Sequence, residues 1–496
     1  MEVSMERVLA GLEPKKFFEY FEDICRIPHE SGNEAGIADY LVKFAEDHGL
    51  EVQRDAFNSV VITKPATPGY EDRKPIMLQG HTDMVCVKED DVEIDFAKDP
   101  IPIYIDGDFV KARGTSLGAD DGHAVAMILA LLDNDELKHP LIQGVFSATE
   151  ETTMAGAENI DGSWLKGEYL FGLDWSKDDT FLLSCCGSSE HCFTLPIGDR
   201  EAVDREGKVK IHLDLFGGEG GHSGKDIGRY RANGNKLMTS ILAGLTEVAD
   251  YGLVDFIGGN QTNVITEWAK ADIICAGKDK EAILAYVKKM GEELTTEFML
   301  TDPNLTLVVE EEALADEVKV LAEKDKEAFL NLMELLPNGV SSWIDQTIYL
   351  AKSSMNIGAV RFHEDTITIR TLVRSNSDHD HDELLRKLKT LAKICGAEDA
   401  MSCKALAWDY VPDSELQREV KRVYKDLFGV EPGFTIAHGQ TETGIFTAKM
   451  KEQGKPIQAV NIGVVTYDVH SFKERMSISS AEKTYKMLCA FLENIK

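Results

Sequence analysis

The stretch Pro75-Ile-Met-Leu-Gln-Gly-His81-Thr-Asp83-Met-Val85 decides how the rest of the chain is interpreted. A short apolar run is followed by a glycine and then by a His-x-Asp pair. Residues i and i+2 of an extended chain share a face, so His81 and Asp83 can point the same way. An acid in that position can hold an imidazole in one tautomer, as acids do beside metals. The pattern equally fits a strand that ends in a polar turn, so it predicts a strand and leaves a metal site open.

Length, composition and charge restrict the class of protein. The chain has 496 residues, of which 43% are apolar, so two or more globular domains are expected. Its 53 basic and 86 acidic residues give a net charge of −33, which argues against nucleic acid or an anionic membrane as a partner. Residues 1–12 lack a long apolar segment, so no signal peptide is predicted. A run of about 20 apolar residues is also lacking, so no transmembrane helix is predicted.

The cysteines indicate the cellular compartment. There are nine of them, they are scattered, and the adjacent pair Cys185-Cys186 does not form a C-x-x-C motif. This usage is typical of reduced thiols in a cytoplasmic protein. We therefore predict a cytoplasmic location and no zinc site made of thiolates.

The hydrophobic periodicity predicts a mixed α/β sheet into which a second domain is inserted. Helices are expected over 15–25, 35–49 and 124–132, and strands over 52–63, 76–78, 141–147 and 169–173. The pattern changes to an α+β style near Cys185 and returns near Tyr410. The predicted limits are 1–188 and 403–496 for the first domain and 189–402 for the insertion. The insertion contains two similar units of strands and helices, which indicates a duplication.

Acids and imidazoles recur after the predicted strands. They are His81 with Asp83, Glu150 with Glu151, Asp174 and His470, and Asp120 lies in a glycine-bounded loop before a helix. Ligands of open α/β sheets gather at the carboxyl ends of strands. Two imidazoles and several carboxylates at such an edge suit zinc or a related divalent ion.

Each of these pieces also has an ordinary interpretation. A Glu-Glu pair is often solvated, the Asp120-Asp121 pair can be a helix N-cap, and His470 can be a loop residue. Glu150 and Glu151 would face opposite ways in a strand, so both can serve one site only where the chain turns. One could then be a ligand and the other a free base. The recurrence of the pattern favours a metal site.

The order of these motifs resembles the two-metal zinc exopeptidases, and within them the aminoacyl-histidine (Xaa-His) dipeptidase branch. The resemblance runs nearly from end to end. It is carried by Ile24 to His29, Leu78 to Val85, Thr115 to Asp120, Gly220 to Gly224, Asn233 to Leu237, Arg374-Ser375 and His438 to Gly444. It implies a mixed-sheet catalytic domain with an inserted α+β lid.

The resemblance also implies a site for two divalent ions, with zinc expected and manganese or cobalt as alternatives. Asp120 would bridge both ions. The remaining ligands would be His81 and Asp174 on one ion, and Glu151 and His470 on the other. Glu150 resembles the family's general base, and Asp83 resembles the acid that orients a ligand.

The insertion contributes further residues by the same resemblance. His222 resembles a histidine that contacts the oxyanion, Arg374 a clamp for the substrate carboxylate, and Asn263 a further substrate contact. His438 and Glu442 are also assigned to substrate binding. A turn histidine, an exposed arginine and a capping asparagine are the ordinary interpretations of the first three.

Some positions depart from the family pattern. Asp121 stands where the nearest relatives have Asn, and Val469 replaces a proline-containing turn before His470. Ser188-Ser189 replaces a glycine pair, and residues 438–444 read His-Gly-Gln-Thr-Glu-Thr-Gly in place of His-Ala-Gly-Leu-Glu-Cys-Gly. The proposed ligands are all retained, so the departures leave the substrate side chain more open than the reaction.

The predicted activity is metal-dependent hydrolysis of a dipeptide, of the Xaa-His type. The alternatives are a tripeptide aminopeptidase or an N-acyl amino acid deacylase, and, from another class, a non-catalytic metal-binding scaffold. A homodimer is compatible with the resemblance. Simple family members pair a single lid unit with that of a second subunit, whereas this insertion has two units. We therefore expect His222 to serve the active site of its own chain.

Overall fold

The computed structural model describes residues 7–315 and 317–495. Contacts divide the chain into two compact units. Unit 1 comprises residues up to Ser184, Tyr410–Ile436 and residues from Thr441 on, and unit 2 comprises Cys185–Asp409 and Ala437–Gln440. Each unit has its own hydrophobic core. The predicted limits of the insertion, 189 and 402, lie inside unit 2, and its role as a lid stays a prediction.

Unit 1 is built on an eight-stranded mixed sheet, which confirms the predicted fold class. The strands in spatial order are β1 (Glu51–Arg54), β2 (Val60–Lys64), β6 (Ile142–Ser147), β3 (Ile76–His81), β7 (Tyr169–Gly172), β21 (Gln458–Asn461), β8 (Thr180–Cys185) and β20 (Gly433–Ala437). Strands β6, β3, β7 and β21 are mutually parallel, so their carboxyl ends meet at one edge. That edge positions the candidate site.

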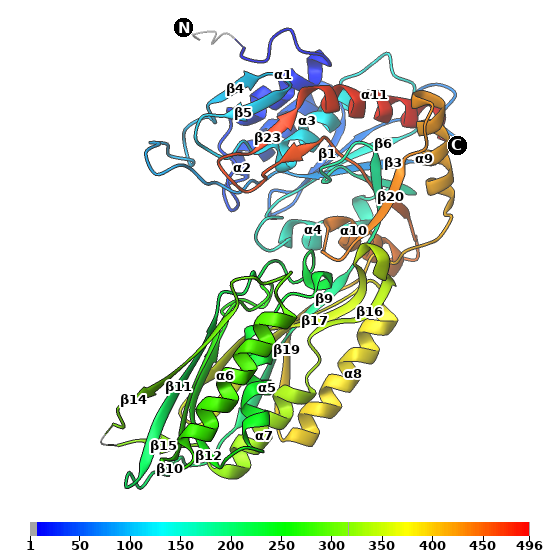
Figure 1. Ribbon diagram of the computed structural model, residues 1–496. Coiled ribbons are helices and arrows are strands. Elements are labelled where there is room, and N and C mark those ends of the chain that lie inside the picture. The colour runs from blue at the N-terminus through cyan, green and yellow to red at the C-terminus, as the bar shows by residue number, and fades with distance from the viewer. Residues whose placement is uncertain (1–6, 316, 496) are drawn as a thin grey trace. The chain divides into compact units, whose positions relative to one another are not determined.

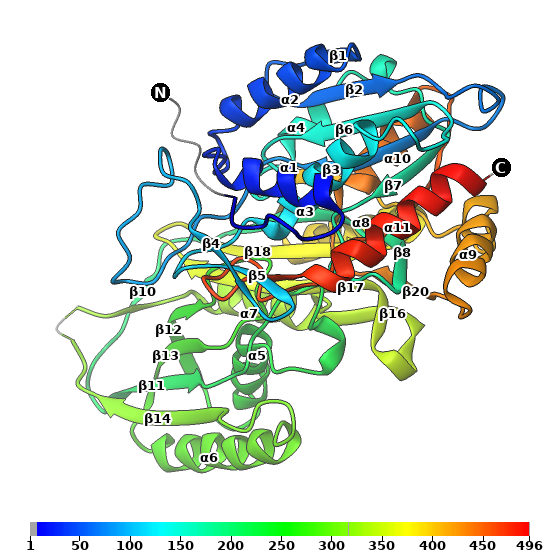
Figure 2. The same ribbon diagram turned by 90° about the horizontal axis from the view of Figure 1, so that it is seen from above.

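Helices cover both faces of this sheet, and the strand sequences explain why (Figures 1 and 2). In β3, Ile76 and Leu78 belong to the larger core, while Met77 between them belongs to a smaller core on the opposite face. The larger core includes α1 (Lys15–Cys25), α2 (Ala35–Asp47), α3 (Ala119–Leu132), α9 (Glu415–Phe428) and α11 (Ile478–Asn494). The smaller includes α4 (Ala155–Asn159) and α10 (Glu442–Glu452). Strands buried on both faces read as continuous apolar runs.

Unit 2 contains one nine-stranded antiparallel sheet with four long helices along one face (Figure 1). Its strands are β9 (Gly187–Pro196), β11 (Lys208–Phe216), β12 (Tyr251–Gly258), β13 (Ala269–Ala276), β14 (Thr306–Glu312), β16 (Gly339–Asp345), β17 (Leu350–Phe362), β18 (Thr366–Ser375) and β19 (Glu398–Ala405). Its helices are α5 (Gly234–Leu245), α6 (Lys280–Glu297), α7 (Glu323–Leu335) and α8 (Asp378–Cys395).

Apart from β16, which pairs with β17 off the main path, the sheet of unit 2 consists of two halves with the same topology. The first half runs β11-α5-β12-β13-α6-β14 and has the spatial order β14-β11-β13-β12. The second runs β9-α7-β17-β18-α8-β19 and has the order β19-β9-β18-β17. Both are therefore βαββαβ units with strand order 4-1-3-2. The two halves join through their second strands, β12 and β17, which pair antiparallel. Along the chain, the whole first half follows β9, which is the first strand of the second half. The duplication expected from the pattern is present in the topology.

Several predicted elements differ in extent. Residues 52–63 form two strands, β1 and β2, because the chain turns at Asn58, which has a φ of 73°. The helix expected over 35–49 ends at Asp47. Across residues 7–315 and 317–495, the helices are all too short or too polar to span a membrane.

Candidate metal centre

The candidate site lies where the parallel strands of unit 1 end. His81 is the last residue of β3, Glu150 and Glu151 follow β6, and Asp174 follows β7. Gly80 explains how closely β3 approaches α3 at this point. A Cβ atom at Gly80 would lie 2.5 Å from the Cβ of Ala124 in α3. The strand and the helix can therefore bring His81 and the first turn of α3 together only with glycine at this position.

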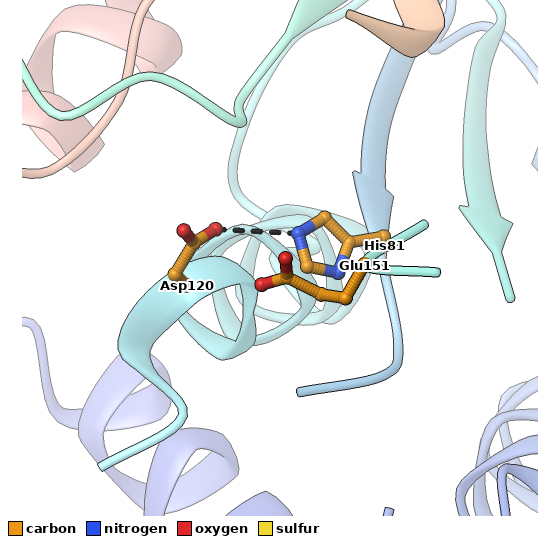
Figure 3. Close-up of side chains that lie close together, drawn as sticks. All are labelled: His81, Asp120 and Glu151. Carbon is orange, nitrogen blue, oxygen red and sulfur yellow. Dashed lines mark hydrogen bonds and ion pairs between the residues drawn. The ribbon is translucent and has the colours of Figure 1, made fainter. Parts of the chain in front are cut away.

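Asp120 stands between two histidines. Its Oδ1 lies 3.2 Å from Nε2 of His81, and its Oδ2 lies 3.3 Å from Nε2 of His470. Nε2 of His470 also lies 2.8 Å from Oε1 of Glu151. Possible ligand atoms of His81, Asp120 and Glu151 lie within 4.8 Å of one another (Figure 3). The two oxygens of one carboxylate thus face two different imidazoles, as a bridging ligand requires.

The tautomer of His81 is fixed by Asp83, although mainly through its backbone. Nδ1 of His81 lies 3.0 Å from the carbonyl oxygen of Asp83 and 3.5 Å from its Oδ1. Nδ1–H donates there, which leaves the lone pair of Nε2 free for a cation. The Asp83 carboxylate accepts bonds from the backbone N–H groups of Glu150 and Glu151, at 2.9 and 3.2 Å. It therefore also holds the turn that carries both glutamates.

That turn separates the two adjacent glutamates. Thr149 has a φ of 58°, so the chain leaves the extended conformation before Glu150. Glu151 then reaches His470, whereas Oε2 of Glu150 lies 4.0 Å from Nε2 of His81. The two side chains therefore take different places in one site, as the sequence required for a ligand beside a base.

The pKa values of the site's side chains show that its carboxylates are crowded together. Loss of hydration, together with the neighbouring Asp120 carboxylate, raises the pKa of Asp174 to about 7. Loss of hydration and nearby acids also raise the pKa of Glu150 well above its usual range. Hydrogen bonds to Asp120 and Glu151 raise the pKa of His470 to about 10. Carboxylates this close together repel one another and raise the pKa values of their neighbours. A divalent cation bound among them would offset their negative charge.

The donor set fits such a cation. Imidazole nitrogens and carboxylate oxygens suit zinc and related divalent ions, and the bridging position of Asp120 suits a pair of them. Asp121 is fully buried, and its Oδ2 accepts a bond from the backbone N–H of His81 at 3.2 Å. Loss of hydration raises the pKa of Asp121 well above its usual range. Asp121, which stands where the family pattern has Asn, therefore contacts the backbone of His81.

A second group of predicted residues lies in unit 2. Nδ1 of His222 accepts bonds from the backbone N–H groups of Gly224 and Lys225, at 3.2 and 3.1 Å. Its proton therefore sits on Nε2, which can donate to an oxyanion. Burial and the nearby Arg374 lower the pKa of His222, which favours this neutral form. Asn263 is exposed, and its carbonyl oxygen accepts a bond from Ser223 beside His222.

Arg374 is a buried cation for which the described residues supply no carboxylate partner. It is only 6% exposed, and its Nη1 lies 3.8 Å from Sγ of Cys186. Within the part of the chain that the structure describes, its Nε has no hydrogen-bond partner. A buried guanidinium is costly unless an anion pairs with it. The geometry thus suits a carboxylate that is not part of the protein.

His438 and Glu442, both assigned to substrate binding from the sequence, are bonded to protein groups. Nε2 of His438 lies 2.7 Å from Oγ of Ser354, and its Nδ1 lies 2.9 Å from Oδ1 of Asn376. Burial and Arg374 lower the pKa of His438 to about 3. Glu442 is 2% exposed and accepts bonds from Gln79 and Ser147. Sequence reasoning missed these partners because they lie far away along the chain.

Comparisons with known proteins now identify the family. Residues 77–494 match the model of peptidase family M20/M25/M40. The chain belongs to this family. It is 34% identical over 487 residues to the cytosol non-specific dipeptidase of Escherichia coli K12, covering 98% of this chain and 99% of that protein.

Solved structures agree. The crystal structure of aminoacylhistidine dipeptidase from Vibrio alginolyticus is 33% identical, with a TM-score of 0.90 and coverage of 99% of both chains. A tripeptidase from Staphylococcus aureus is 14% identical, with a TM-score of 0.54 and coverage of 98% of this chain and 99% of that chain, which shows a shared fold alone. The resemblance inferred from the motifs is therefore confirmed, and the protein is a peptidase.

Removing divalent ions should abolish hydrolysis and lower Tm. A ligand that binds only the folded state stabilises it, and here it also relieves repulsion among the carboxylates. Chelated protein would be assayed for dipeptide hydrolysis and scanning calorimetry, and then resupplied separately with zinc, manganese or cobalt. Undiminished turnover in protein that elemental analysis shows to be metal-free would contradict the metal centre.

Proposed function

We propose that this chain is a metal-dependent dipeptidase acting on Xaa-His dipeptides in the cytoplasm. The observation that carries the proposal is the Asp120 carboxylate, whose two oxygens face His81 and His470 separately. The full-length similarity to a cytosol dipeptidase and to an aminoacylhistidine dipeptidase supports the substrate class and the location.

Five residues would hold two divalent ions in this proposal. Asp120 would serve both ions, His81 and Asp174 would complete one set of ligands, and Glu151 and His470 would complete the other. Zinc is the proposed ion, because the ligands are imidazoles and carboxylates. When bound, the ions supply Lewis acidity toward the scissile carbonyl and activate water for attack.

Glu150 acts as the general base in this proposal. Its Oε2 lies 4.0 Å from Nε2 of His81, and the bond from its backbone N–H to Asp83 fixes its backbone. It takes the proton of the attacking water and returns it to the leaving amine, so the peptide bond breaks without a net change in protons.

Unit 2 binds the substrate in this proposal. His222 donates its Nε2 proton to the developing oxyanion, a contact worth roughly 3–4 kcal/mol in enzymes where such donors were removed. Arg374 pairs with the C-terminal carboxylate, because its planar fork matches a carboxylate in two places. Asn263 adds a further substrate contact.

A substrate panel tests the proposal against its alternatives. Dipeptides ending in histidine and in other residues, tripeptides and N-acyl amino acids would be compared by kcat/KM with the zinc-loaded protein. The proposal predicts the highest value for Xaa-His dipeptides. A preference for tripeptides or acyl amino acids would instead support a sister amide hydrolase, and no turnover at all would support a metal-binding scaffold.

Glu150→Gln should lower kcat by about 100- to 10,000-fold while the metal content stays at about two ions per chain. The amide keeps the shape of the side chain but cannot accept the proton of water. Rate and metal content would be measured on the same sample. Retained activity would exclude Glu150 as the base, and lost metal would mean that the roles of Glu150 and Glu151 are exchanged.

Arg374→Ala should raise KM for dipeptides with a free C-terminal carboxylate by about 10- to 100-fold, the range for a lost hydrogen bond to a charged group. Dipeptides amidated at that end should already be poor substrates and should hardly become worse. An equal loss for free and amidated dipeptides would make Arg374 a structural residue.

Co-expressing His222→Ala protein with Glu150→Gln protein should not restore activity. His222 lies between β11 and α5 in the first half of unit 2, Arg374 lies in β18 of the second half, and in this proposal both serve the active site of their own chain. The mixed sample would be assayed beside each variant alone. Activity recovered only in the mixture would show that the histidine is donated between subunits.

A further inference from the structure

Glu474 is a buried acid that bonds to the loop of Asp120. Its side chain is only 3% exposed. Its Oε2 accepts the backbone N–H groups of Leu117 and Gly118, at 2.8 and 3.0 Å. Its Oε1 accepts the backbone N–H of Asp120 at 3.1 Å. Both oxygens are therefore occupied by the backbone of one short segment.

This segment needs an acceptor from elsewhere. The first N–H groups of a helix have no partner within the helix, and a polar side chain at the N-cap usually accepts one of them. The N-cap of α3 is Gly118, with a φ of 70°, and glycine has no side chain to do so. A carboxylate is also favoured at a helix N-terminus by the helix dipole. Glu474 therefore bonds, from a distant part of the sequence, to the segment that leads into α3: of the three N–H groups that it accepts only that of Asp120 lies within α3, and the backbone there is not helical.

The loop that carries Glu474 also carries His470. The backbone N–H of Glu474 donates to the carbonyl oxygen of Ser471, the neighbour of His470, at 3.1 Å. Immediately after Glu474, β23 (Arg475–Ser477) pairs with β5 (Phe109–Ala112). Glu474 is therefore followed directly by a paired strand, and its backbone is bonded to the loop that carries His470.

We propose that Glu474 is a positioning residue that sets the separation between the carboxylate of Asp120 and the imidazole of His470. The proposal rests on the proposed function, in which both side chains bind metal. Glu474 is not itself a ligand, because its two oxygens accept backbone N–H groups. It acts by bonding the loop of one ligand to the loop of the other, across which Oδ2 of Asp120 lies 3.3 Å from Nε2 of His470.

Glu474→Gln tests this role with little change in shape. One oxygen becomes an NH₂ group, so a donor faces at least one backbone donor and the loop of Asp120 loses an acceptor. Partners that orient metal ligands commonly contribute about 10- to 100-fold to metal affinity. We expect that loss for the more weakly held of two cobalt ions, together with a changed visible spectrum of the bound Co²⁺. Glu474→Asp, which retains the charge but shortens the reach, should give an intermediate loss.

Glu22→Gln is a matched control. Glu22 is 2% exposed in the same unit, and its oxygens accept the backbone N–H groups of Val8 and Leu9, at 3.0 and 2.9 Å. Glu22 also pairs with Arg26, and none of its bonds involves a proposed ligand. The control should lower Tm as any lost buried bond does, and it should leave the affinity for Co²⁺ and the spectrum unchanged.

The measurement is a Co²⁺ titration of full-length, metal-stripped protein, followed by calorimetry and visible absorption, with Tm measured for each variant. Wild-type affinity and spectrum in Glu474→Gln would overturn the inference alone. An equal change in Glu22→Gln would also overturn it, because the effect would then be general destabilisation. If Glu474→Gln does not fold, Glu474→Asp decides by the same criteria. If the unmodified protein takes up no cobalt, the proposed function fails first.

Discussion

Repulsion among the carboxylates at the ends of β3, β6 and β7 is the constraint on which this structure depends. Burial and mutual proximity raise the pKa of Asp174 to about 7 and that of Glu442 to about 8. Acids crowded in this way are stable only if cations or N–H donors offset their charge. Two imidazoles, the backbone of the Glu150 turn and the N-terminus of α3 supply part of that compensation. The remaining charge is what makes the edge of the sheet a binding site for divalent ions.

Unit 2 differs from unit 1 because it holds a buried cation, Arg374, for which the described residues supply no carboxylate partner. Arg374 is the penultimate residue of β18 in one βαββαβ half, and His222 follows β11 in the other. The halves join through β12 and β17, so the joined sheet brings both groups into one unit. The effect of Arg374 on the pKa of His222 shows that the two are electrostatically coupled. The duplicated unit therefore carries both groups within one compact part of the chain.

Structural features that depend on local sequence pattern could be predicted, whereas features that depend on contacts between distant residues could not. The strand end at His81 and the inserted domain follow from periodicity and motif order. The divergence of Glu150 and Glu151 required a turn, which depends on the positive φ of Thr149 and has no clear sequence signal. The role of Glu474 could not be predicted, because the N–H groups that it accepts lie 354 to 357 residues away. A glycine at the N-cap of α3 was the one available hint that the cap comes from elsewhere.

The motif from His438 to Glu442 shows why a resemblance can identify a segment without giving its role. His438 is bonded through both ring nitrogens to Ser354 and Asn376 in unit 2. Glu442 begins α10 in unit 1 and accepts bonds from Gln79 and Ser147. Each end of the motif is thus tied to a different unit by buried polar bonds, and an unmade bond of this kind is costly. These bonds account for the His and the Glu at the two ends of the motif, and the assignment of both residues to substrate binding stays a prediction.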